Sequence, residues 1–148
     1  LGGSHGGFTT GPKVLIEYLR QKSRPYLFSN TLPPAVVLGS IAALDLVEKD
    51  RSFVDRLREN TRYFREQLTA RGVKVQEGIH PIVPILIGDT AKAISMSKEL
   101  LRRGVYVSGF GFPVVPQGQA RLRCQVSAAH TREHLDRAIA AIVEVVGW

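Results

Sequence analysis

Cysteine is nearly absent from this sequence, and so are long apolar runs. Cys124 is the single cysteine among 148 residues, which excludes an intrachain disulfide and a cysteine-based zinc knuckle. Because no stretch of about 18 consecutive apolar residues is present, we expect no membrane-spanning helix. A basic stretch followed by an apolar one is also missing at the N-terminus, so we expect no signal peptide. These absences favour a globular protein of the cytoplasm.

Aromatic residues are also scarce, at 7% of the chain, and this bears on the meaning of its positive charge. A formal net charge of +7 could indicate binding to nucleic acid or to another anionic ligand. The arginines between residues 51 and 71, however, alternate with the acidic residues Asp55, Glu59 and Glu66. Such spacing is typical of a solvated helix face with ion pairs three and four residues apart. With no aromatic stripe or nucleic-acid motif beside it, we expect no nucleic-acid partner.

Glycine and proline divide the first part of the chain. Glycines crowd the segment 1–7, which is therefore unsuited to be an ordinary first element of a domain. Residues 8–11 predict a short strand, and Pro12 predicts the start of a helix. Residues 25–30 are expected to be extended, and the proline pair at 33–34 to stop that segment and start the next helix.

The remainder of the chain has the pattern of an α/β unit. Apolar spacing predicts, in chain order, a helix through 37–47, a helix through 53–68, strands at 73–75 and 82–87, a helix at 91–103, strands at 105–107 and 120–126, and a helix from Arg132. Gly72 and Gly104 are expected to end two of the helices, and Thr131 to cap the last one. Pro84 indicates that its strand lies at a sheet edge or contains a bulge. We therefore expect helices packed against a small sheet.

Polar and apolar residues alternate in the strand predicted at 120–126. Leu122, Cys124 and Val126 share one face, and Arg121, Arg123 and Gln125 share the other. The apolar face is expected to pack, whereas the arginine face meets solvent or an anion. Guanidinium suits an anion because its planar fork can form a bidentate, charge-assisted pair with a carboxylate. The pattern alone leaves both roles open for Arg123, and for Arg121 it favours solvent.

The spacing of the four histidines does not predict a metal site. His130 and His134 straddle the start of the last predicted helix instead of lying on one helical face. His5 follows Ser4 in a glycine-rich turn that has no nucleophile-elbow pattern. We therefore expect neither a metal site nor a Ser/His/Asp triad.

Three stretches of the sequence, at residues 1–9, 24–35 and 109–131, resemble the α-oxoamine synthases. The first begins Leu-Gly-Gly-Ser-His-Gly-Gly, the second contains Arg-Pro-Tyr-Leu-Phe-Ser-Asn, and the third contains Pro-Val-Val-Pro-Gln-Gly-Gln-Ala-Arg-Leu-Arg. These enzymes use pyridoxal phosphate (PLP), have the fold called type I among PLP-dependent enzymes, and work as homodimers. The resemblance implies that residues 1–34 are the tail of the large PLP-binding domain. Residues 35–148 would be the small C-terminal α+β domain, with helices on a small, mainly antiparallel sheet.

The resemblance also implies a reaction between an amino acid and an acyl-CoA. The main expectation is condensation of glycine with acetyl-CoA to 2-amino-3-oxobutanoate and CoA, and the alternative is alanine with a pimeloyl thioester. In the family, a lysine in Gly-Lys-Ala directly before the Leu-Gly-Gly sequence holds PLP covalently, which would place it two residues before Leu1. No lysine of this chain stands in that context. We therefore expect no catalytic residue in the chain and no synthase activity from it alone.

Two binding residues are implied by the same resemblance. Arg123 would bind the α-carboxylate of the amino acid substrate, and Ser29 would bind the PLP phosphate of the neighbouring subunit. Two interpretations from other classes remain beside the enzyme. One is a stand-alone small α/β binding module, and the other, motivated only by the charge, is a nucleic-acid binder.

Overall fold

The computed structural model describes residues 5–147, and their contacts divide the chain into two compact units. The first unit runs to Arg51 and the second begins at Ser52. The helix that follows Pro33 belongs by its contacts to the first unit, whereas the family resemblance assigns it to the small domain. The domain assignment 1–34 and 35–148 for an intact protein stays a prediction.

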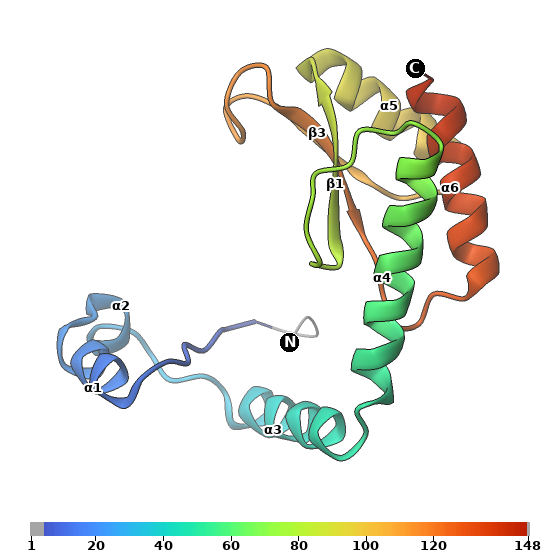
Figure 1. Ribbon diagram of the computed structural model, residues 1–148. Coiled ribbons are helices and arrows are strands. Elements are labelled where there is room, and N and C mark those ends of the chain that lie inside the picture. Colours follow the sequence, from blue (N-terminus) through green and yellow to red (C-terminus); the bar gives the residue numbers. More distant parts are fainter. Residues whose placement is uncertain (1–4, 148) are drawn as a thin grey trace. The chain divides into compact units, whose positions relative to one another are not determined.

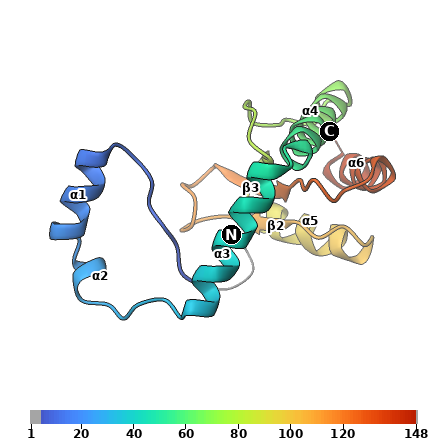
Figure 2. The same cartoon turned by 90° about the horizontal axis from the view of Figure 1, so that it is seen from below.

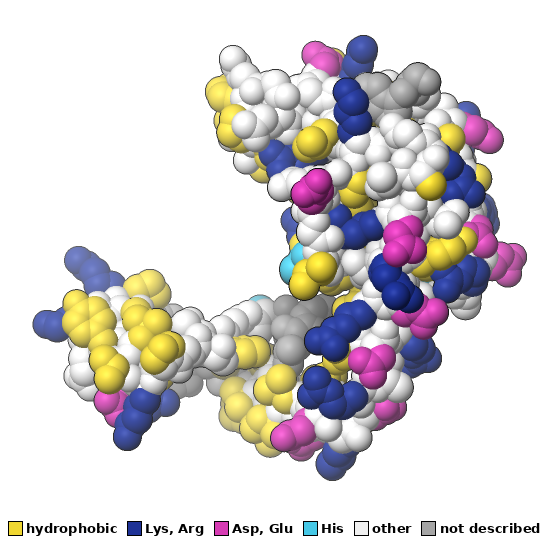
Figure 3. Space-filling view, in the orientation of Figure 1, with side chains coloured by type: hydrophobic (Ala, Val, Ile, Leu, Met, Phe, Trp, Pro, Cys, Tyr) yellow, Lys and Arg dark blue, Asp and Glu magenta, His cyan; other side chains and the backbone are white. Residues whose placement is uncertain are grey.

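The first unit contains three helices, whose starts are set by local signals. They are α1 (Lys13–Lys22), α2 (Arg24–Leu27) and α3 (Pro34–Lys49). Pro12 and Pro33 are the residues before α1 and α3, so the predicted helix starts are confirmed. No residue in the range 5–60 is buried. Hydrophobic side chains accordingly gather on the surfaces of α1 and α3, where Figure 3 shows them in yellow.

Two predictions for the first unit are wrong. Residues 8–11 form no strand, because a strand needs a hydrogen-bonded neighbour and this unit offers none among its described residues. The segment 25–30 is not extended throughout, because its beginning belongs to α2. Pro25 lies in the first turn of α2, where proline is tolerated since the missing N–H has no helical partner there.

The second unit combines helices with strands that form one sheet (Figure 1). Its elements are α4 (Ser52–Ala70), β1 (Ile82–Gly88), α5 (Thr90–Arg102), β2 (Ser108–Phe110), β3 (Ala120–Gln125) and α6 (Arg132–Val146). The strand order is β1-β3-β2, and both pairings are antiparallel. The expected α+β domain with helices on a small antiparallel sheet is therefore confirmed. Pro84 lies in β1, which is an edge strand of the sheet as its proline predicts.

One face of this sheet forms the core with the three helices of the second unit, which gather beside it in Figures 1 and 2. The strands contribute Val83 and Ile85 from β1, and Leu122 and Cys124 from β3. The helices contribute Phe64, Leu68, Leu100, Leu135, Ile139, Ile142 and Val146. The predicted alternation in β3 is confirmed, because its apolar residues are buried while Arg123 and Gln125 are exposed. The opposite face of the sheet is open within this unit.

Two strand predictions in the second unit need correction. Residues 73–75 form only a single bridge, between Val75 and Ile85. The backbone there runs along the outer edge of β1, where Gln76 N–H donates to the Pro84 carbonyl and Leu86 N–H donates to the Lys74 carbonyl. The strand predicted at 105–107 lies three residues later, as β2. The position of the strand is set by packing, because β2 approaches the backbone of α5 so closely that only glycine fits at position 109.

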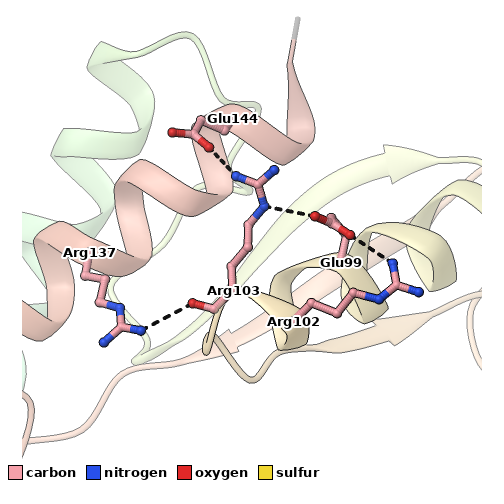
Figure 4. Close-up of polar contacts among 5 residues, drawn as sticks. All are labelled: Glu99, Arg102, Arg103, Arg137 and Glu144. Atoms are coloured by element: carbon pink, nitrogen blue, oxygen red, sulfur yellow. Dashed lines mark hydrogen bonds and ion pairs between the residues drawn. The ribbon is translucent and has the colours of Figure 1, made fainter.

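The helix ends of the second unit are held by side chains. Thr131 caps α6, where its hydroxyl accepts from the His134 N–H at 3.3 Å and the His134 ring accepts from the Thr131 N–H, so the predicted cap is confirmed. A charged cluster joins the C-terminal end of α5 to α6 (Figure 4). Arg103 pairs with Glu99 on α5 and with Glu144 on α6. The sheet is thereby backed by helices that are tied to one another.

Candidate functional site

Arg123 lies at the centre of the open face of the sheet. It belongs to β3, the middle strand, and is paired with Pro84 of β1 on one side and with Ser108 of β2 on the other. Because paired residues of antiparallel strands project to the same face, these three positions form one row across the sheet. The buried neighbours Leu122 and Cys124 fix which face Arg123 presents.

The guanidinium of Arg123 has no hydrogen-bond or ion-pair partner among residues 5–147. Its contact there is with the ring of Phe110, whose centroid lies 5.8 Å from the guanidinium carbon. Arg121, on the same face, is engaged instead: its guanidinium donates to the backbone and side-chain oxygens of Gln119 and to the side chain of Gln76. Of these two arginines, Arg123 is therefore the one whose N–H donors are available to an anion.

A hollow of about 710 Å³ opens beside Arg123. It lies between residues 104–108, the end of β3 with the loop after it, and α6. Its lining residues include the core residues Phe64, Leu135 and Ile142, and also Ser108, Arg123, Gln125 and His130. A volume of this size matches the range of pockets that take small molecules.

The two histidines of this region act mainly as supports of the backbone. The Nδ1 atom of His130 accepts from the Ser127 N–H at 3.2 Å, and the Nδ1 atom of His134 accepts from the Thr131 N–H at 3.3 Å. Asn60 of α4 reinforces the same loop by donating to the carbonyls of Ser127 and His130. Within residues 5–147 no group of His, Cys, Asp and Glu side chains is arranged to hold a metal ion.

Cys124 lies directly beside Arg123 in the sequence but points into the core. Burial raises the pKa of its thiol to about 12. A thiol with so high a pKa is protonated at neutral pH and is a poor nucleophile. The prediction that Cys124 is a core residue is therefore confirmed, and its chemistry does not belong to the site.

Ser29 lies in the first unit, two residues after the end of α2. It is exposed, and among residues 5–147 its hydroxyl makes only a long contact, donating to the carbonyl of the neighbouring Asn30 at 3.5 Å. A hydroxyl held so weakly can still donate to an external acceptor such as a phosphate oxygen. Ser29 and Arg123 belong to different units, so the contacts given for each residue are those within its own unit. Their predicted roles stay predictions.

Ser108 and Phe110 are neighbours of Arg123 that the sequence pattern did not predict as part of the site. The strand was expected at 105–107 because Val-Tyr-Val has higher β propensity than Ser-Gly-Phe. That register places neither residue opposite β3. The signal that could have found them is the glycine at position 109, since a glycine within a strand often marks a close approach of another backbone.

Comparison with known proteins gives a consistent result for the whole chain. Residues 2–142 match the family model described as aminotransferase class I and II. The 2-amino-3-ketobutyrate coenzyme A ligase of Escherichia coli is 49% identical over 145 residues, which cover 98% of this chain and 36% of the relative. The 8-amino-7-oxononanoate synthase of Symbiobacterium thermophilum is 46% identical over 140 residues, covering 95% of this chain and 36% of the relative.

Solved structures agree with the sequence relatives. A lysine-to-alanine variant of a serine palmitoyltransferase from S. paucimobilis, with a bound aldimine of PLP and myriocin, matches with a TM-score of 0.79 and 29% identity, covering 88% of this chain and 34% of that one. In the part of the chain that the structure describes, no helix is long and apolar enough to cross a membrane. The chain spans about a third of the length of the curated relatives it matches. By the match over nearly all its residues, this chain belongs to the aminotransferase class I and II family.

Proposed function

We propose that this chain serves a PLP-dependent acyltransferase that condenses glycine with acetyl-CoA to 2-amino-3-oxobutanoate and CoA. The observation that supports this most directly is an exposed arginine with no hydrogen-bond or ion-pair partner among residues 5–147, at the centre of an open sheet face. The chain that carries it is 49% identical to a 2-amino-3-ketobutyrate coenzyme A ligase. The amino acid and acyl-CoA substrates, the homodimer and the cytoplasmic location belong to the same proposal.

Arg123 is proposed to bind the α-carboxylate of the amino acid. The planar guanidinium presents parallel N–H donors that match the two oxygens of a carboxylate, so it fixes the orientation of the group as well as its position. The row formed with Pro84 and Ser108 lies on a sheet whose other face is packed core, which holds the Cα of Arg123 in place. A bound amino acid is thereby anchored at one end while its α-carbon stays accessible.

Ser29 is proposed to help hold PLP through a phosphate oxygen. The residue fits this group, because within the described part of the chain its exposed hydroxyl has only the long contact with Asn30, and a short side chain loses little entropy on binding. When bound, PLP supplies the electron sink that allows a carbanion to form at the α-carbon of an amino acid. The chain contributes binding and orientation, and we propose that it does not perform the reaction alone.

A second candidate function is the condensation of alanine with a pimeloyl thioester. Its support is the 46% identity to an 8-amino-7-oxononanoate synthase, close to the value for the first candidate. The two candidates share the role of Arg123, because both amino acids have the same α-carboxylate. The two candidate functions are distinguished by comparing the rate of condensation of glycine with acetyl-CoA and that of alanine with a pimeloyl thioester.

The role of Arg123 can be tested in a chimera in which this chain replaces the matching segment of the E. coli ligase. A charge-assisted hydrogen bond contributes about 1.5–3 kcal/mol, so loss of one from the bidentate pair corresponds to a tenfold to hundredfold change in binding. Arg123→Lys keeps the charge and removes the fork, and should raise the KM for glycine by roughly that factor. The PLP absorbance spectrum should stay unchanged, because Arg123 is not assigned to the cofactor.

Arg121→Lys is the matched control, since Arg121 shares the same strand face and is engaged with Gln119 and Gln76. It should leave the KM for glycine within about twofold of the parent chimera, a difference of less than 0.5 kcal/mol. If Arg121→Lys weakens glycine binding and Arg123→Lys does not, the carboxylate role belongs to another residue. If the parent chimera folds and binds PLP but accepts neither amino acid, the proposed function is wrong.

A further inference from the structure

Strand β2 is held against α5 by contacts on both sides of Phe110. The Ser97 hydroxyl donates to the Val107 carbonyl at 2.7 Å, and the Phe112 N–H donates to the Thr90 hydroxyl at 3.3 Å. Between them, a side chain at Gly109 would bring a Cβ to 2.7 Å from the Ala93 carbonyl oxygen. The backbone of α5 and that of β2 are therefore in direct contact, and β2 has little freedom to shift.

This contact determines where Phe110 points. Alternate residues of a strand face opposite ways, so Gly109 faces the helix while Ser108 and Phe110 face the open side. Phe110 is paired with Arg121 across the strands, yet Arg121 turns its guanidinium to Gln119 and Gln76. The ring of Phe110 is thereby left to the diagonal neighbour Arg123, whose guanidinium carbon lies 5.8 Å from the ring centroid.

We propose that Phe110 is a positioning residue for Arg123. An aromatic face attracts a cation without using its N–H donors, unlike a carboxylate partner, which would occupy the donors that a ligand needs. Phe110 thus restricts the guanidinium to one region of the open face and leaves its fork available. The inference rests on the proposed function only for the identity of the ligand, an amino acid carboxylate.

The positioning can be measured in the 148-residue chain itself by NMR of the arginine Nε–H groups. In the unaltered chain we expect nuclear Overhauser effects between the Arg123 side chain and the Phe110 ring. Phe110→Leu should change the chemical shift of the Arg123 Nε–H and lower its order parameter, whereas Phe110→Tyr should restore both, because a tyrosine ring also attracts cations. Absence of the Overhauser effects in the unaltered chain would overturn the proposal even if Phe110→Leu did not fold.

Phe112→Leu is the matched control. Phe112 is exposed and lies just beyond β2, and no contact with Arg123 involves its ring among residues 5–147. Its replacement should leave the Arg123 signal unchanged, and the backbone amide signals of β3 should be the same in all variants that fold. Equal Arg123 order parameters in Phe110→Leu and in the unaltered chain would also overturn the proposal.

The chimera with the E. coli ligase separates this inference from the proposed function. Phe110→Leu should raise the KM for glycine about twofold to fivefold, the range expected for an exposed cation–π contact, with kcat unchanged and with rescue by Phe110→Tyr. If Arg123→Lys raises the KM and Phe110→Leu does not, the positioning role is wrong and the function stands. If Arg123→Lys has no effect either while the Overhauser effects are present, the carboxylate role is wrong and the positioning stands.

Discussion

The helices of the two units differ in how far their side chains are buried. Among residues 5–51 no side chain is buried, although α3 is largely apolar and α1 has an apolar stripe. In the second unit, α4, α5 and α6 all contribute buried residues to one core with the sheet. Local signals such as the prolines before α1 and α3 thus define where a helix begins. A buried core requires partners from distant parts of the sequence, and only the second unit provides them among the described residues.

The largest effect is expected when an apolar side chain is truncated in each unit. Ile139→Ala in α6 removes a side chain that is 2% exposed and should lower the free energy of unfolding of the second unit by about 2–5 kcal/mol. Leu44→Ala in α3 removes one that is 48% exposed and should change it by less than about 0.5 kcal/mol. Urea denaturation followed by the NMR signals of β3 measures both. Equal losses would mean that α3 belongs to the same folding unit.

A second test compares thiols in the two units. Burial raises the pKa of Cys124 to about 12 from an ordinary value of 9.0, so at pH 8 its thiolate fraction is about a thousandfold lower than that of an exposed thiol. Alkylation by iodoacetamide should be slower by about that factor than for a cysteine introduced by Ile41→Cys in α3. Mass spectrometry of the two sites measures the rates, and similar rates would contradict the burial of Cys124.

The same thiol predicts how stability depends on pH. Its pKa is higher in the folded than in the unfolded chain, so the folded state keeps its proton when the unfolded state loses it. The contribution to stability is therefore fully present below about pH 9 and is lost as the pH rises toward 12. Cys124→Ala should lessen this part of the alkaline dependence, which urea titrations at several pH values would detect.

The smallest expected effect concerns helix caps. Thr131→Ala removes the hydroxyl that accepts from the His134 N–H, and should destabilise the second unit by about 1 kcal/mol. Ser23 precedes α2 in the first unit, but its side chain makes no capping bond. Ser23→Ala should therefore leave the urea midpoint unchanged. A larger effect of Ser23→Ala than of Thr131→Ala would show that the first unit contributes to the stability of the second.

Periodicity predicted the elements whose side chains repeat regularly over many residues. The helix from Arg132 was predictable because a threonine cap precedes a regular apolar spacing, and the faces of β3 followed from its strict alternation. The short elements were not predictable in the same way. A three-residue strand has too few side chains for a period, and the position of β2 depends on the contact of Gly109 with α5.

The candidate site was predictable only in part for a related reason. Arg123 was found because its own strand has a clear pattern and because the surrounding residues resemble a known family. Its availability depends on contacts outside that pattern. The neighbouring Arg121 is engaged by Gln119, just before β3, and by Gln76, which is distant in the sequence. The contact with Phe110 depends on the register of β2 against β3. Such information resides in pairings between segments and is absent from the pattern of any single one.

The segment 74–76 along β1 has a consequence for aggregation. Unpaired backbone groups at a sheet edge are templates for adding a strand from another molecule. On the outer side of β1, the Pro84 carbonyl and the Leu86 N–H are already bonded to this segment, and the strand at the other edge, β2, is three residues long. The sheet therefore offers little edge on which fibrils could grow.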